Sequence, residues 1–160
     1  MLNIKIICVG KLKERFYLDA AAEYVKRLGP LCRLEVEELP ESRLPAEPSE
    51  AETEAALRRE AESIALRIPA GSTLIALCIE GREMDSVQFS KFLELCAIRG
   101  KSKLCFLIGG SVGLHSALKA RADLKLSMSP MTFPHHLARI MLLEQIYRAF
   151  QISGGSKYHK

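Results

Sequence analysis

A chain of 160 residues suits one compact domain, residues 1–160, which can bury a core without disulfide or metal staples. Its five cysteines are scattered and include no C-x-x-C pair, which excludes a disulfide framework and indicates reduced thiols in a cytoplasmic protein. No stretch is apolar enough to span a bilayer, and the N-terminal residues lack an export cleavage site, so we expect neither membrane insertion nor secretion.

The formal net charge of +4 is unevenly distributed. Residues 35–62 contain ten glutamates and three arginines, a charge of −7, so the rest of the chain carries +11. A basic surface draws phosphate-rich partners by long-range attraction and counterion release. The pattern therefore fits either an ordinary solvated surface or one that binds nucleic acid.

Patterns typical of strands and helices alternate along the first half of the chain. The apolar run IKIICVG at residues 4–10 predicts a strand, and apolar residues then recur with helical spacing up to Gly29-Pro30. The alternating sequence RLEVEEL at residues 33–39 predicts a half-exposed strand. After a proline-rich loop, a capping box at residues 49–52 opens an amphipathic helix.

Two continuous apolar runs follow, TLIALCI at residues 73–79 and LCFLIGG at residues 104–110. A helix that starts near Asp85 or Ser86 separates them. Runs of this kind are typical of strands buried on both faces, so we expect an α/β domain with a mostly parallel sheet flanked by helices. Ligands of such sheets bind at the carboxyl ends of the strands, which directs attention to the loops after both runs.

The second of these loops contains Gly109, Gly110 and Gly113 in the pattern G-G-x-x-G. It matches neither the dinucleotide fingerprint nor the phosphate-binding P-loop. The glycines fit either a close approach of backbone to a ligand or a tight turn from strand to helix.

Residues 127–136, SMSPMTFPHH, combine methionines, prolines and a histidine pair before a long apolar helix. His135 and His136 are adjacent, so their side chains diverge by about 100° on a helix, and no carboxylate or cysteine nearby completes a metal site. No serine of this region has the sequence of a nucleophile elbow. The segment either binds an apolar-edged ligand such as a purine or closes the sheet edge.

Residues 137–152 are apolar around most of a helix. Such a helix is buried on two sides, either inside its own domain or against another subunit. In a domain of this size we favour a homodimer.

Several of these segments together carry a family resemblance. They are ICVGKLKE, KRLGP, LCIEGRE, FLIGGSVGLH, LSMSPMTFPHHLARIMLLEQIYRAFQI and the terminal YHK. With them the chain resembles the ribosomal RNA large subunit methyltransferase H family from its first residue to its last. The resemblance implies a SPOUT-type C-terminal trefoil knot and a homodimer with cofactor pockets at the subunit interface. It also implies S-adenosylmethionine-dependent methylation of N3 of a pseudouridine in 23S ribosomal RNA of the assembled ribosome.

By the same resemblance, residues 127–133 form the knot loop around the methyl donor, and backbone groups hold its adenine and ribose. The cofactor contacts carried over are Leu77, Gly109, Met128, Ser129, Pro130, Met131, Thr132 and Phe133. No metal is implied.

Methylation of N3 requires an in-line approach to the methyl group and the loss of the imide proton. Candidates for the proton transfer or for a supporting positive field are His135, Arg139, Tyr158, His159 and Lys160. Arg139 fits equally well as a structural ion-pair partner. The tail residues Lys157, Tyr158, His159 and Lys160 are RNA-binding candidates, although a terminal KYHK also fits a disordered end.

Two other functions fit the same residues. One is a non-catalytic ribosome or RNA-binding factor that uses the basic surface alone, and the other is a knotted transfer RNA methyltransferase. Binding of the cofactor separates the first from the family function, and the choice of RNA separates the second.

Overall fold

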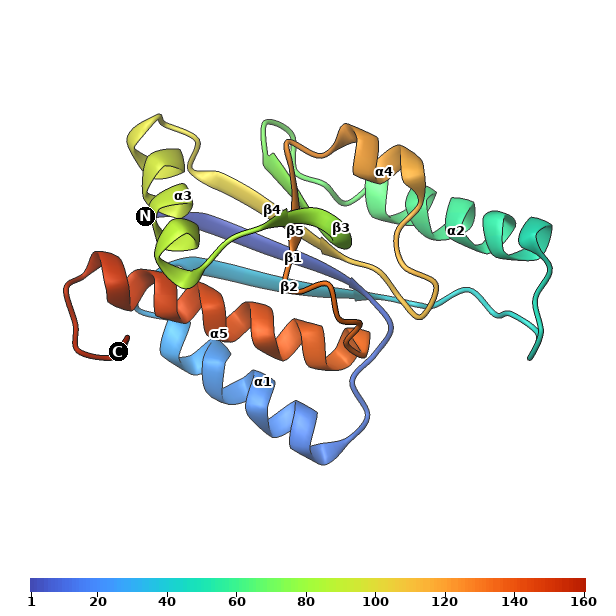
Figure 1. Ribbon diagram of the computed structural model, residues 1–160, viewed down its shortest axis with the longest axis horizontal. Coiled ribbons are helices and arrows are strands. Elements are labelled where there is room, and N and C mark those ends of the chain that lie inside the picture. The colour runs from blue at the N-terminus through green and yellow to red at the C-terminus, as the bar shows by residue number, and fades with distance from the viewer.

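The computed structural model describes all 160 residues and shows an α/β domain (Figure 1). Its elements are β1 (Asn3–Val9), α1 (Arg15–Leu28), β2 (Arg33–Leu39), α2 (Glu50–Ala65), β3 (Thr73–Glu83), α3 (Ser86–Ile98), β4 (Lys103–Ile108), α4 (Ser116–Arg121), β5 (Leu124–Ser127) and α5 (His135–Ser153). The five strands form one sheet in the order β2-β1-β4-β3-β5, and all of its pairings are parallel. The predicted parallel sheet flanked by helices is confirmed.

Alternation along the interior strand β1 explains how the sheet is covered on both faces. Ile6 pairs with Val36 of β2 and Phe106 of β4, and it belongs to the larger core cluster, which α1, α3 and α5 complete. Ile7 points to the other face, where α2 and α4 complete a smaller cluster. Both side chains are fully buried, so the continuous apolar sequence of β1 serves two cores at once.

Two capping boxes fix where helices begin. Ser49 and Glu52 exchange hydrogen bonds of 3.1 Å at the start of α2, as the sequence predicts. Asp85 and Gln88 do the same at the start of α3 with distances of 2.7 and 2.9 Å. Each box satisfies backbone groups that a helix start leaves without partners.

Helix α5 lies between α1 and α3 on one face of the sheet (Figure 1). No side chain from residue 135 to residue 152 is classed as exposed, and Leu142, Leu143 and Ile146 are fully buried. One face of α5 is therefore buried inside the protomer, while the remaining side chains of the helix up to residue 152 are half-buried. None of the helices combines the length and the apolar character needed to cross a membrane.

Replacing Leu143 by aspartate is consequently expected to unfold the protomer, not to release folded monomers. The side chain is 0% exposed in the larger core, so the change buries an unpaired charge and should cost more than about 4 kcal/mol of unfolding free energy. Circular dichroism with chemical denaturation measures the loss. Leu66→Asp is the matched control, because Leu66 is 84% exposed. A folded and stable Leu143→Asp monomer would contradict the placement of Leu143 in the core of the protomer.

Candidate functional site

A cavity of about 740 Å³ lies beyond the carboxyl end of β4, against residues 77–80 of β3 and beside the segment that leads into α5. Most of the residues singled out in the sequence meet there. They are Leu77, Gly109, Met128, Ser129, Met131, Thr132, Phe133 and His135. Pro130 belongs to the same segment but does not line the cavity. The structure thus brings seven of the eight expected cofactor contacts, and His135, to one site.

The cavity also contains groups that the sequence analysis did not single out. Residues 78–80 enter it where the pairing of β3 with β5 shifts register between Leu77 and Arg82. Lys119 of α4 lines the wall beside them, and its Nζ lies 2.6 Å from Glu80 Oε1. β3 pairs with β4 only as far as Ala76, so residues 78–80 lie just past the end of this pairing, where ligands of parallel sheets bind.

The glycine-rich loop is a tight turn that also forms a wall of the cavity. The Gly113 N–H donates to the Gly110 carbonyl at 3.0 Å, and Gly113 has a φ of +81°, a conformation that favours glycine. A Cβ on Gly109 would lie 2.4 Å from backbone atoms of Gly113. The tight-turn interpretation of the G-G-x-x-G pattern is confirmed, and the close approach of its backbone to a ligand stays a prediction for residues that line the cavity.

The segment between β5 and α5 is stabilised by its own serines. Ser127 Oγ donates to the Ser129 carbonyl at 3.1 Å, and Ser129 Oγ accepts from the Met131 N–H at 3.0 Å. Met131 remains 72% exposed at the cavity, whereas Met128 packs against the larger core. The serine side chains thus shape the loop, while methionines and Phe133 present apolar surface to the cavity.

His135 is the first residue of α5 and lines the cavity. Of its two ring nitrogens, only Nε2 is fully buried without a hydrogen-bond partner, and Nε2 lies 4.0 Å from Glu41 Oε2. Burial lowers the pKa of the His135 imidazole, and His136 and Arg139 also act to lower it. Glu41 acts to raise this pKa, but the net shift is downward. The ring is therefore neutral at neutral pH and able to accept a proton.

Arg139 lies outside the cavity, 3% exposed, in the ion pair that the sequence left as an alternative. Its Nη1 donates to Glu38 Oε2 at 2.6 Å, and its Nη2 donates to the Gly10 carbonyl at 2.9 Å. Glu38 Oε2 also accepts from the Leu12 N–H at 3.0 Å. Arg139 thus ties α5 to the ends of β1 and β2.

Replacing Arg139 by methionine is expected to lower the unfolding free energy by about 3 kcal/mol at neutral pH, because the change leaves Glu38 without its partner. Burial acts to raise the pKa of Glu38, but bonds from Arg139 and Leu12 lower it below the ordinary value. The pair therefore stabilises above the unfolded pKa of about 4.3 and loses its contribution as pH falls through the folded pKa. Urea unfolding at several pH values measures this. An unchanged acid dependence in Arg139→Met would contradict the pairing.

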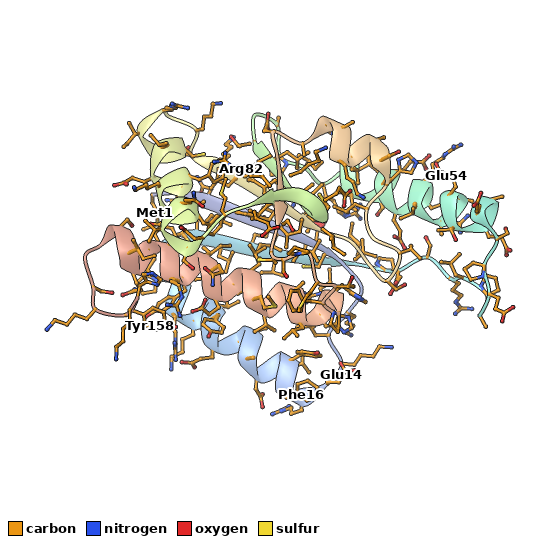
Figure 2. The ribbon with its side chains drawn as sticks, viewed as in Figure 1. Met1, Glu14, Phe16, Glu54, Arg82 and Tyr158 are labelled. Atoms are coloured by element: carbon orange, nitrogen blue, oxygen red, sulfur yellow. The ribbon has the colours of Figure 1, made fainter.

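The C-terminal tail packs against the last part of α5 (Figure 2). Tyr158 Oη donates to Glu144 Oε1 at 3.2 Å, and the Arg148 guanidinium lies 4.8 Å from the Tyr158 ring centre. His159 Nδ1 lies 3.1 Å from Arg148 Nη1. Tyr158 and His159 are therefore held in place, and the alternative of a disordered end does not apply to them.

The tail is remote from the cavity of its own protomer. Tyr158 and His159 contact Glu144 and Arg148, which lie nine and thirteen residues after His135 on α5, so about 13 to 20 Å of helix separates these contacts from His135. The C-terminus lies at the opposite end of α5 from the helix start (Figure 1). The structure thus separates Tyr158 and His159 from His135. No group of three or more histidine, cysteine, aspartate or glutamate side chains is placed to hold a metal ion.

A match to a family model places this domain, with its parallel sheet and its cavity, in the SPOUT methyltransferase class. Residues 2–159 match the family described as predicted SPOUT methyltransferase. The chain is 47% identical to the ribosomal RNA large subunit methyltransferase H of Leuconostoc mesenteroides, with 99% of this chain and 100% of that protein covered. The corresponding protein of Streptococcus suis is 46% identical over the same shares. The chain belongs to the ribosomal RNA large subunit methyltransferase H family.

Solved structures agree on the fold at low sequence identity. A probable methylase family protein from Haemophilus influenzae is similar with a TM-score of 0.54 and 17% identity, over 99% of this chain and 71% of that chain. A putative methyltransferase from Legionella pneumophila, solved with bound SAM, has a TM-score of 0.50 and 11% identity, over 95% and 66%. At these identities the similarity establishes the fold alone.

Proposed function

We propose that this protein transfers the methyl group of S-adenosylmethionine to N3 of a pseudouridine in the 23S ribosomal RNA of the assembled ribosome. One observation carries the proposal: a single cavity gathers seven of the eight cofactor contacts that the family resemblance assigns. The full-length relatives named ribosomal RNA large subunit methyltransferase H support the RNA substrate. Such a substrate places the protein in the cytoplasm.

The residues of the cavity fit this cofactor. Its volume of about 740 Å³ lies within the range of small-molecule sites, and about half of its lining residues are hydrophobic. Leu77, Leu126 and Phe133 offer apolar surface for an adenine ring, and the backbone of Gly109 and Gly110 can approach it closely. S-Adenosylmethionine supplies an electrophilic methyl group when bound.

The chain itself has to orient the base and remove its imide proton. His135 is assigned to this second task, because it lines the cavity and its pKa is lowered by burial. As N3 forms its bond to the methyl carbon and the bond from that carbon to sulfur breaks, the imide proton passes to the neutral imidazole. Arg139 stabilises α5 and acts on the reaction through His135, because it holds the helix that carries His135 and also lowers the pKa of that side chain.

We further infer a knotted homodimer in which the tail of one subunit serves the cavity of the other. The knot is supported by the SPOUT family match. Donation between subunits is supported by the position of Tyr158 and His159, which lie far along α5 from their own cavity. Lys157 and Lys160 are exposed beside them. An aromatic ring, a histidine and two cations within four residues suit contacts to an RNA base and its phosphates.

Methyl transfer to isolated substrates tests the function. Purified protein and labelled S-adenosylmethionine are mixed separately with assembled ribosomes, protein-free ribosomal RNA and transfer RNA. We expect label in the large-subunit RNA of assembled ribosomes alone. Label in transfer RNA would favour a transfer RNA methyltransferase, and ribosome binding without cofactor binding or transfer would favour a non-catalytic factor.

A further inference from the structure

We propose that Glu41 is a positioning residue of the cofactor cavity: one carboxylate oxygen holds the glycine-rich loop and the other orients His135. The inference rests on the proposed function and adds to it a residue that does not itself line the cavity. Glu41 follows the edge strand β2, whereas Ser111, which it contacts, follows β4, and β1 lies between these two strands. The contact of Glu41 with Ser111 therefore joins two segments that are not neighbours in the sheet.

The first oxygen of Glu41 is committed to the loop. Oε1 accepts two hydrogen bonds from Ser111, one from the backbone N–H at 2.8 Å and one from Oγ at 2.6 Å. A Cβ on Gly110 would lie 2.7 Å from this oxygen, so the carboxylate fills the space that the glycine leaves. Ser111 and Gly110 both line the cavity. Glu41 therefore fixes the shape of the wall that they form.

The segment that carries Glu41 is itself anchored. The Ser42 N–H donates to Glu60 Oε2 at 2.8 Å, and Glu60 of α2 is 5% exposed. The bond from Ser42 to the buried Glu60 side chain fixes the backbone next to Glu41. The Glu41 carboxylate can therefore hold Ser111 in one position. Burial acts to raise the pKa of Glu41, but the Ser111 bonds and the nearby histidines lower it, so the carboxylate is charged at neutral pH.

The second oxygen faces His135. Glu41 Oε2 lies 4.0 Å from His135 Nε2, and this nitrogen is buried with no hydrogen-bond partner. The other titratable or charged groups near the ring are His136, whose Nδ1 lies 3.9 Å from Glu14 Oε2, and the cation of Arg139. Glu41 is the neighbouring carboxylate that acts to raise the pKa of His135.

This arrangement assigns a proton position. A movement of about 1 Å brings Oε2 into hydrogen-bond range of Nε2–H. A proton held on Nε2 leaves Nδ1 of His135 as the acceptor for the imide proton, and the carboxylate then stabilises the imidazolium. The role is that of the carboxylate that orients a catalytic histidine in other enzymes.

Three variants separate the two roles of Glu41. Glu41→Ala removes both, Glu41→Gln keeps an oxygen acceptor for Ser111 but no charge, and Glu47→Gln removes a charge from an exposed side chain in the same acidic stretch. Calorimetry measures the affinity for S-adenosylmethionine. NMR follows the titration of His135, with its signal among four histidines assigned from a His135→Asn variant.

We expect Glu41→Ala to weaken cofactor binding roughly tenfold to hundredfold, the range for lost hydrogen bonds to a charged group. Glu41→Gln should bind nearly as tightly as the wild type. In both variants His135 should titrate at lower pH, because a nearby negative charge is gone. Glu47→Gln should match the wild type in both measurements.

Two results would overturn the proposal. One is a Glu41→Ala protein whose cofactor affinity stays within about twofold of the wild type. The other is an unshifted His135 titration in both Glu41 variants, which would reduce Glu41 to a loop contact. Neither measurement needs RNA, so a wild-type protein that methylates no ribosomal RNA would refute the proposed function without deciding this test.

Discussion

Gly109→Val is expected to abolish cofactor binding, and with it all methyl transfer. Gly109 follows β4 directly and begins the turn that lines the cavity. From the sequence, a side chain there is expected to block the approach of the cofactor to the backbone. In the structure, a side chain at position 109 would first collide with the protein itself. Its Cβ would lie 2.4 Å from backbone atoms of Gly113 and 2.9 Å from the Leu114 nitrogen.

Backbone atoms at such distances cannot turn away as a flexible side chain can. The turn between residues 110 and 113 must therefore open, and the wall of the cavity moves with it. We expect the affinity for S-adenosylmethionine to fall by more than about a hundredfold, since a displaced wall removes several contacts at once. Even Gly109→Ala should weaken binding, because its Cβ meets the same backbone atoms.

The matched control is Gly100→Val. Gly100 has a φ of +75°, so valine there strains the backbone, but its Cβ would meet nothing within 4 Å. This variant should lose stability while it keeps its cofactor affinity. Calorimetry on both folded variants separates a local effect on the site from general destabilisation. If Gly109→Val bound S-adenosylmethionine as tightly as the wild type, the glycine-rich loop would not be part of the cofactor site.

Deletion of residues 157–160 is expected to remove methylation while it spares cofactor binding. The tail contacts α5 through Tyr158 and His159 at partly exposed positions, so its loss should change stability little. The proposed role of the tail is to contact RNA and not the cofactor, so the affinity for S-adenosylmethionine should stay close to that of the wild type. Calorimetry and a methylation assay on ribosomes measure the two properties.

Mixed dimers test whether the tail acts on the partner subunit. The tail-deleted chain keeps an intact cavity, and the Gly109→Val chain keeps an intact tail. A dimer of the two contains one complete site only when the tail is donated across the interface. We expect activity to return on mixing, with native mass spectrometry to confirm that mixed dimers form. No recovery in such dimers would mean that each tail serves its own subunit or none.

Sequence patterns predicted the elements whose burial is extensive. β1, β3 and β4 carry long apolar runs, and the capping box of residues 49–52 marks the start of α2. β5 was not predicted, because LKLS at residues 124–127 is too short for a periodic signal. The short helix α4 was expected only as a helix start after the glycine loop. These elements take their structure from tertiary contacts, such as the pairing of β5 with β3.

The position of the site could be predicted from the sequence, but most of its individual contacts could not be predicted by physical reasoning. Physical reasoning alone reached the loops at the strand ends, whereas the family resemblance supplied the individual cofactor contacts. Glu41 had no signal, because its bonds to Ser111 join residues 70 positions apart. The partners of Arg139 are likewise remote, with Glu38 101 positions away. A single sequence does not encode such pairings in any local pattern.

Mass spectrometry of 23S ribosomal RNA from cells with and without this protein tests the proposed function most directly. In RNA from cells with the protein we predict an N3-methylated pseudouridine. In RNA from cells without it we predict unmethylated pseudouridine at the same position. Adding back the wild-type gene should restore the methyl group, whereas adding back Gly109→Val should not. The same methylation in both cell types would contradict the proposed reaction.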